Sequence, residues 1–267
     1  MSKTIIHLVE TQRRHTDLRL AAGPRPHTVN PDRLSRWLTA WRLSVAIQKM
    51  LKATNHINKN SSILILGCAE GYEGTILSDL GFADVTVSDL SEVAVKVALA
   101  RDKRLRGCSV DIENCSIPSE SFDVVIVQDA LHHLPRPVNG FTEMLRIARH
   151  AALFLEPHDS LAGRHVGRTW EKNGEAVNYV FRWTKSLVQN VTCSFLGHDR
   201  FLNLSFSFWH HNPRLERVGR MLGGGTLALS SIRFGKAVMD FVAPSSGNQF
   251  CGLVIKSANS AGGRRDR

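Results

Sequence analysis

Residues 60–157 alternate regularly between short β-rich runs and helical segments, and this alternation constrains the fold more than any other feature of the chain. The runs predicted as strands are residues 63–66, 84–88, 108–111, 123–128 and 151–156, and helical patterns over residues 73–80, 93–105 and 139–148 separate most of them. Strands and helices in this order are typical of a parallel sheet that is covered by helices on both faces. The sequence therefore predicts a doubly wound α/β core, with its ligand site in the loops that follow the strands.

The first predicted strand runs directly into a turn that contains glycine. The sequence Ile63-Leu64-Ile65-Leu66-Gly67-Cys68-Ala69-Glu70-Gly71 joins a buried strand to a helix. Glycine at positions 67 and 71 lets the backbone turn tightly and approach a ligand, and the helix that follows offers unpaired N–H groups. Ordinary strand-to-helix connections look the same, so the turn alone does not establish a ligand site.

Two acidic residues stand at the ends of the next two predicted strands. Asp89 follows Gly67 by 22 positions, where a carboxylate can accept hydrogen bonds from both ribose hydroxyls of a nucleoside. The alternative role for Asp89 is to cap the helix that begins near Ser91. Asp111-Ile112 ends the third predicted strand. The glycine turn and the acidic strand ends together favour a ligand that contains a nucleoside.

With the loop after the fourth strand, these motifs resemble the class I S-adenosylmethionine-dependent methyltransferases, in particular the branch of ubiquinone-biosynthesis and other small-molecule enzymes. That loop reads Val127-Gln128-Asp129-Ala130-Leu131-His132-His133-Leu134 and is similar to the family's loop at the methyl-transfer site. The resemblance covers about residues 60–157. It implies a Rossmann-like fold with a mostly parallel seven-stranded sheet, S-adenosyl-L-methionine as cofactor, and methyltransferase activity.

The resemblance places the cofactor at the carboxyl ends of the first four strands. It implies that Asp111 and Ile112 hold the adenine, through a carboxylate and an apolar contact. The cofactor-binding residues expected on this basis are Gly67, Cys68, Ala69, Glu70, Gly71, Asp89, Leu90, Asp111, Ile112, Gln128 and Asp129.

The chain departs from the family pattern at two positions of the glycine turn. Ile65 stands where the family usually has an acidic residue, and Ala69 stands where it usually has another glycine. Glu70 is expected to replace part of the missing carboxylate's role, and Ala69 still allows a close turn if its φ is negative. These departures bear on cofactor affinity more than on the fold.

Transfer to a hydroxyl group calls for a base near the methyl-transfer site. His132 and His133 lie in the implied loop, and imidazole titrates near neutral pH; the alternative for each is a structural role beneath the loop. Glu156 or Asp159, after the adjacent strand, could orient an imidazole or merely cap the next segment. The expected catalytic residues are His132, His133 and Glu156. No metal site is expected, because neither the five cysteines nor His210-His211 show a ligand spacing.

The chain divides into four predicted segments. Residues 1–30 show no sustained period and are expected to form an N-terminal arm or lid, and residues 31–157 a leading helix plus the cofactor-binding core. Trp37 and Trp41 of the leading helix are expected to pack on the sheet or, alternatively, to border a substrate cleft. Residues 158–256 are expected to form an inserted substrate cap and the last strands of the sheet, and residues 257–267 a disordered tail.

The leading functional hypothesis is methyl transfer to a small-molecule acceptor, with a hydroxyl oxygen as the expected target. A net charge of +10 and a pI of about 9.8 favour an RNA methyltransferase as the alternative, although the loop after the fourth strand lacks the motifs of amino-group and pyrimidine methylation. Ile65 and Ala69 suggest a second alternative, a non-catalytic cofactor-binding subunit. No apolar run spans 18 residues, so a cytoplasmic protein without a membrane segment is expected. A homodimer is left open.

Overall fold

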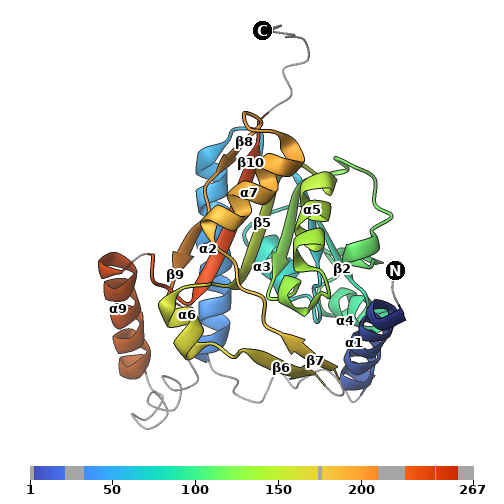
Figure 1. Ribbon diagram of the computed structural model, residues 1–267, viewed down its shortest axis with the longest axis horizontal. Coiled ribbons are helices and arrows are strands. Elements are labelled where there is room, and N and C mark those ends of the chain that lie inside the picture. Colours follow the sequence, from blue (N-terminus) through green and yellow to red (C-terminus); the bar gives the residue numbers. More distant parts are fainter. Residues whose placement is uncertain (1–2, 22–32, 174–175, 210–225, 244, 258–267) are drawn as a thin grey trace, which may run out of the picture.

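The computed structural model of the protein describes residues 3–21, 33–173, 176–209, 226–243 and 245–257. Its centre is a mostly parallel sheet in the order β3-β2-β1-β4-β5-β10-β8, with β9 also paired to β10 (Figure 1). Among the described strands of this sheet, β10 runs in the opposite direction, because it pairs antiparallel with β5, β8 and β9. The strands are β1 (Ser62–Leu66), β2 (Asp84–Asp89), β3 (Arg106–Ser109), β4 (Phe122–Gln128), β5 (Ala148–Pro157), β8 (Phe201–Asn203), β9 (Phe206–Phe208) and β10 (Gln249–Lys256).

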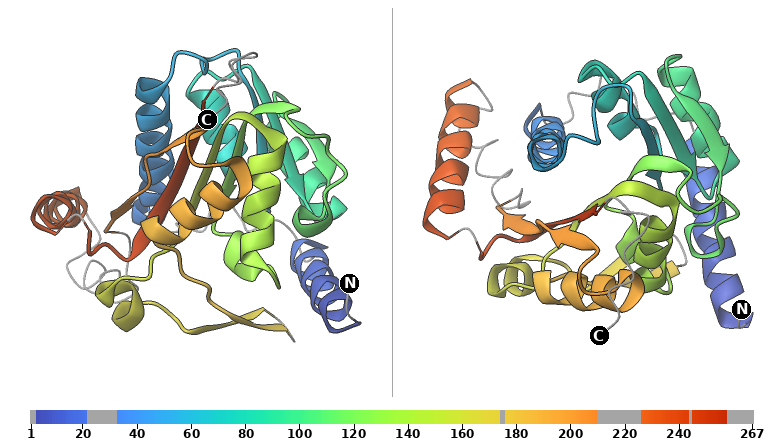
Figure 2. Two further views of the ribbon diagram at one scale, coloured as in Figure 1. Left: turned by 45° about the horizontal axis from the view of Figure 1, so that its top comes forward. Right: turned by 90° about the horizontal axis from the view of Figure 1, so that it is seen from above.

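Helices cover both faces of this sheet, as the alternation of elements predicts. Because side chains alternate along a strand, Ile63 and Ile65 of β1 face one layer while Leu64 and Leu66 face the other. The first layer is formed by α2 (Arg33–Ala53), α3 (Tyr72–Asp79) and α4 (Glu92–Arg101), and the second by α5 (Pro137–Ile147) and α7 (Lys185–Leu196) (Figure 2). The predicted doubly wound α/β fold is therefore confirmed.

The third strand is shifted from its predicted place. It spans Arg106–Ser109 instead of residues 108–111, because its pairing with β2 ends at Asp89 and Ser109. The chain then turns, and Asp111 caps a short 3₁₀ helix, η1 (Ile112–Asn114), by accepting a hydrogen bond from the Glu113 N–H at 2.9 Å. The prediction that Asp111 ends the strand was wrong by two residues, although Asp111 still lies at the carboxyl edge of the sheet.

The N-terminal segment forms a helix, α1 (Lys3–Ala21), that packs against α4 beside the carboxyl edge (Figure 1). The sequence shows no helical period there because α1 is a polar helix in which Leu20 is the buried apolar residue identified among its described side chains. The predicted leading helix is present as α2. Its Trp41 packs against Phe208 on the sheet, whereas the side chain of Trp37 lies outside the described residues.

The segment after β5 contributes the predicted last strands of the sheet and a small hairpin. The hairpin consists of β6 (Trp170–Asn173) and β7 (Ala176–Tyr179), follows α6 (Leu161–Val166), and lies near the carboxyl edge of the sheet (Figure 1). Helix α9 (Thr226–Val242) stands at the side of the molecule. The tail beyond Ser257 and the pair His210-His211 lie outside the described residues. In the part of the chain that the structure describes, every helix is too short or too polar to cross a bilayer.

Candidate active site

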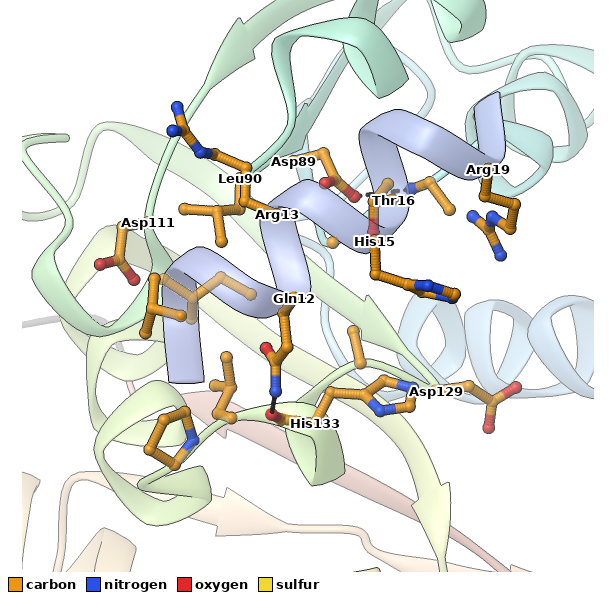
Figure 3. A pocket seen from close by; sticks show the side chains of 17 residues that line it. Gln12, Arg13, His15, Thr16, Arg19, Asp89, Leu90, Asp111, Asp129 and His133 are labelled. Atoms are coloured by element: carbon orange, nitrogen blue, oxygen red, sulfur yellow. Dashed lines mark hydrogen bonds between the residues drawn. The ribbon is translucent and has the colours of Figure 1, made fainter. Parts of the chain in front are cut away.

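A cavity of about 270 Å³ lies between α1 and the carboxyl ends of β1, β2 and β4 (Figure 3). Seven of the residues predicted to bind a cofactor line it, together with His133. Helix α1 supplies the opposite wall, through six side chains. The sheet-side residues among those predictions are Gly67, Ala69, Asp89, Leu90, Asp111, Ile112 and Asp129, and the α1 residues are Val9, Gln12, Arg13, His15, Thr16 and Arg19.

The glycine turn after β1 adopts a conformation that brings backbone to the cavity wall. Gly67 has a φ of 68°, and a Cβ atom at this position would lie 2.6 Å from the Cβ of Ala130. Any larger residue is therefore excluded by conformation and by space. Ala69 has a φ of 44°, so the chain makes this close turn without the negative φ that was set as its condition. A non-glycine residue in the left-handed region is uncommon and costs free energy, and such residues cluster at functional sites.

Asp89 connects this turn to the start of α4. One of its carboxylate oxygens accepts a hydrogen bond from the Ala69 N–H at 2.9 Å, and the other accepts one from the Ser91 N–H at 3.0 Å. Ser91, in turn, caps α4 through the Ala94 N–H. Both roles considered for Asp89 are thus compatible, because it supports the helix start and also lines the cavity. Burial raises the pKa of Asp89, and the two N–H donors oppose that shift.

Four of the predicted cofactor residues do not line the cavity. Cys68 is buried in the core, and Gly71 begins α3 with a φ of 77°. Glu70 points toward α4, where its carboxylate pairs with Arg101 at 3.0 Å. Gln128 is buried and donates a hydrogen bond to Glu73 at 3.2 Å. These residues shape the turn and the floor of the site, and the carboxylate missing at Ile65 is not replaced at the cavity by Glu70.

Asp129 leaves β4 in a strained conformation, with a φ of 51°. Its carboxylate forms an ion pair with Arg42 of α2, whose side chain is 2% exposed. Arg42 also donates a hydrogen bond to Gln249 of β10 at 3.3 Å. Because an Arg from α2 neutralises it, Asp129 does not add an uncompensated charge to the cavity wall. The sequence offered no signal for Arg42, which lies 87 positions before its partner.

Glu156 and His132 form a buried pair at the ends of two neighbouring strands. The Glu156 carboxylate is 0% exposed and accepts hydrogen bonds from the N–H groups of Ala130 and Leu131 at 2.8 and 2.7 Å. It also lies 2.5 Å from Nδ1 of His132. The predicted proximity of the two loops is present, because β4 and β5 are parallel neighbours. Glu156 thereby holds both the η2 turn (Leu131–His133) and the ring of His132.

A second carboxylate, which sequence reasoning missed, reaches the same histidines from the hairpin. Glu171 of β6 places an oxygen 3.4 Å from Nε2 of His132 and 3.7 Å from Nδ1 of His133. Its cross-strand partner Asn178 accepts a hydrogen bond from Gln12 of α1 at 3.3 Å. Gln12 also donates to the backbone carbonyl of His133 (Figure 3). The hairpin and α1 therefore meet over the histidine loop.

The two histidines have opposite electrostatic environments. Burial disfavours the charged form of His132, but the carboxylates of Glu156 and Glu171 outweigh it and raise the pKa of His132 to about 10. Burial, with the neighbouring charge of His132, lowers the pKa of His133. Of the two, His133 lines the cavity. The structure thus brings His132, His133 and Glu156 together, and it shifts the pKa values of the two histidines in opposite directions.

Several side chains of the segment that follows β5 lie away from this cluster. Asp159 pairs with Arg164 on the exposed start of α6, and its side chain does not reach the histidines. Trp183 is buried in the core beneath the sheet. Trp170 and Tyr179 form a cross-strand pair next to the Glu171–Asn178 pair, so they point to the opposite, exposed face of the hairpin. Glu171 and Asn178 connect the hairpin to the site through their contacts with the two histidines and with Gln12.

The sheet order, the glycine turn and the acidic strand ends are typical of proteins that bind a nucleoside-containing ligand at the carboxyl edge of a doubly wound α/β fold. Residues 64–155 match the family model described as a methyltransferase domain. The chain therefore contains a methyltransferase domain, which spans the sheet from β1 to β5. A search of curated proteins finds no match.

Solved structures with this fold are distant in sequence. The magnesium protoporphyrin IX methyltransferase of Synechocystis PCC 6803, solved with bound S-adenosylhomocysteine, is 14% identical with a TM-score of 0.56, over 96% of this chain and 100% of that chain. The cyclase SpnF is 16% identical with a TM-score of 0.59, over 92% and 96% of the chains. A putative methyltransferase in complex with the Trm112 activator of Haloferax volcanii is 13% identical with a TM-score of 0.55, over 85% and 99%. These likenesses show the shared fold.

Proposed function

We propose that the protein transfers the methyl group of S-adenosylmethionine to a hydroxyl oxygen of a small-molecule acceptor. One observation carries this proposal: the cavity that is lined by the cofactor motifs is also lined by His133, which belongs to a buried imidazole–carboxylate cluster. When bound, the cofactor supplies an electrophilic methyl group on a sulfonium centre. The chain's own tasks are then to hold the nucleoside, exclude water and accept the acceptor's proton.

The residues at the sheet edge fit the nucleoside part of this cofactor. We call Gly67, Ala69, Asp89, Leu90, Asp111 and Ile112 the nucleoside side of the cavity. Because Gly67 has no Cβ atom, its backbone leaves a space at the cavity wall that a side chain would fill. The Asp89 carboxylate has lone pairs left to accept hydrogen bonds from ribose hydroxyls. Asp111 and Ile112 offer the carboxylate and apolar contact expected for adenine. The donors, acceptors and apolar surfaces match the chemistry of the group.

The histidine cluster suits the removal of a proton from a hydroxyl. We call His132, His133, Glu156 and Glu171 the acceptor side. Glu156 fixes the ring of His132, and Glu171 contacts both rings, so the imidazoles are held in one arrangement before any acceptor arrives. Such preorganisation is what general base catalysis requires of its participants.

A small acceptor is favoured over RNA by the way α1 lies across the site. Val9, Gln12 and Thr16 form part of the cavity wall, and Gln12 holds α1 to the histidine loop. Because α1 covers part of this edge of the sheet, the site suits a small molecule better than a folded RNA, which needs an open groove. The net charge of +10 keeps RNA as the second candidate acceptor.

A non-catalytic subunit is the other candidate function. It is favoured by Ile65, which is buried in β1 where the family usually has an acid, and by the strained Ala69. A related fold has been solved in complex with an activator protein, so partner binding is part of this candidate. The complete imidazole–carboxylate cluster beside the cavity argues for an enzyme, because a subunit that only binds the cofactor has no need of it.

The proposal is tested by following a labelled methyl group. The protein is incubated with S-adenosylmethionine that carries a trideuterated methyl group and with a panel of phenols, alcohols and hydroxy acids, while total RNA is supplied in a parallel reaction. Mass spectrometry should find the label on an oxygen atom of a small molecule. Label that appears only in RNA would support the second candidate, and cofactor binding without labelled product in either reaction would support the non-catalytic subunit.

A further inference from the structure

We propose that His132, His133 and Glu171 form a binding site for one divalent transition-metal ion at the wall of the cavity. The three residues each offer one ligand atom, and these atoms all lie within 4.8 Å of one another. Two imidazole nitrogens with one carboxylate oxygen form a ligand set that suits Zn²⁺, Mn²⁺, Co²⁺ or Fe²⁺. The sequence predicts no such site, because Glu171 comes from a hairpin 38 positions after His133.

The spacing of the ligand atoms matches that of a metal centre. Ligands roughly 2.0–2.2 Å from a metal lie roughly 3.0–3.6 Å from one another in tetrahedral or octahedral geometry. The Glu171 oxygen lies 3.4 Å from Nε2 of His132 and 3.7 Å from Nδ1 of His133. The two imidazole nitrogens lie within 4.8 Å of each other. Glu171 and His133 are only partly buried, at 30% exposure each, which leaves their side chains room to adjust toward an ion.

Glu156 supplies the support that a metal-binding imidazole needs. It lies 2.5 Å from Nδ1 of His132, which leaves Nε2 on the side of Glu171. Histidine ligands in proteins almost always donate their other ring N–H to a carboxylate, a carbonyl or water, and this contact fixes the tautomer and the ring orientation. A fully buried carboxylate that also accepts backbone hydrogen bonds is a rigid support of that kind.

The charges of the cluster also favour a divalent cation. Glu156 and Glu171 bring two negative charges to opposite nitrogens of one imidazole. A single proton on His132 balances one of them, whereas a divalent ion between neutral imidazoles balances both. The nearby Asp129 is already neutralised by Arg42 and does not need the ion. Burying an uncompensated charge is costly, so full compensation stabilises the cluster.

The position of the site suggests what the ion does. His133 lines the cavity, and an ion held by three protein ligands would keep coordination positions free for a hydroxyl oxygen of the acceptor. Coordination would lower the pKa of that hydroxyl, so that its proton could pass to the ring nitrogen of His133 that does not hold the ion. This role rests on the proposed function, in which the cluster deprotonates the acceptor; binding of the ion does not.

The test measures metal binding directly, with untagged full-length protein stripped by chelation. Co²⁺ is titrated while visible absorption and calorimetry are recorded, and Zn²⁺ is then added as a competitor. One Co²⁺ per chain should bind with a visible d–d band that Zn²⁺ abolishes. Glu171→Gln and His133→Ala should each weaken Co²⁺ binding at least about 10-fold. The same substitution at an exposed carboxylate, Glu120→Gln, should leave it unchanged.

The outcomes separate this inference from the proposed function. No stoichiometric Co²⁺ binding, or binding that both Glu171→Gln and His133→Ala retain, overturns the metal site. Methyl transfer that continues at full rate in the chelated protein overturns the ion's role in the reaction while the proposed function stands. Stoichiometric binding at Glu171 without methyl transfer to any hydroxyl compound upholds the site and contradicts the proposed function.

Discussion

The nucleoside side and the acceptor side of the cavity are built in different ways. On the nucleoside side, each residue lies at the end of a strand or in the few residues that follow it, and the backbone conformation at Gly67 and Ala69 shapes the turn. On the acceptor side, four side chains from η2, β5 and β6 meet through contacts between them. The nucleoside side is therefore a property of the fold, whereas the acceptor side depends on a side-chain network that the fold does not specify.

This difference agrees with the finding that proteins of one fold carry out different reactions. A magnesium protoporphyrin IX methyltransferase and a cyclase share the architecture of this chain at TM-scores of 0.56 and 0.59. The fold alone therefore does not determine the reaction, and function has to be argued from the site. In this chain, the side-chain network next to His133 carries the information about the reaction.

The largest expected effect comes from breaking the acceptor side alone. His133→Ala should lower kcat by about 10²–10⁴ while the Kd of S-adenosylhomocysteine stays nearly unchanged, because in the proposed function His133 acts on the acceptor and not on the cofactor. Steady-state kinetics and calorimetry measure the two quantities. The control is His198→Ala, which removes an exposed histidine after α7. Near-full kcat in His133→Ala would mean that alignment of the substrates is sufficient for the reaction.

A second substitution tests how strongly Glu156 holds the side chains of the acceptor side in place. Glu156→Gln removes one acceptor oxygen from a carboxylate that accepts several N–H groups, so the free energy of unfolding should fall by about 2–3 kcal/mol. Urea unfolding followed by circular dichroism measures this loss. The exposed control Glu92→Gln should stay within about 0.5 kcal/mol of the unmodified protein. A loss below about 1 kcal/mol for Glu156→Gln would show that the network is not preorganised by this residue.

The same contrast explains how far the sequence could predict the structure. The alternation of strands and helices, Gly67 and Asp89 were all predicted, because each depends on local pattern and on backbone geometry. His132 and Glu156 were predicted to meet because neighbouring parallel strands bring their loops together. Glu171 and Arg42 were missed, since each reaches the site from a distant element through a side-chain contact. Helix α1 was missed because its stability comes from polar contacts such as Asp17 with Ser91.

Calorimetry with S-adenosylhomocysteine tests the central claim most directly, because this product of methyl transfer binds without further reaction. One molecule per chain should bind, and Asp89→Ala should weaken binding by about 1.5–3 kcal/mol, which is about 10–150-fold in Kd. Asp89→Asn keeps one acceptor oxygen and should have a smaller effect, and Asp159→Ala, outside the cavity, should have none. Absence of binding by the unmodified protein, or an unchanged Kd in Asp89→Ala, would contradict the assignment of this edge of the sheet to the cofactor.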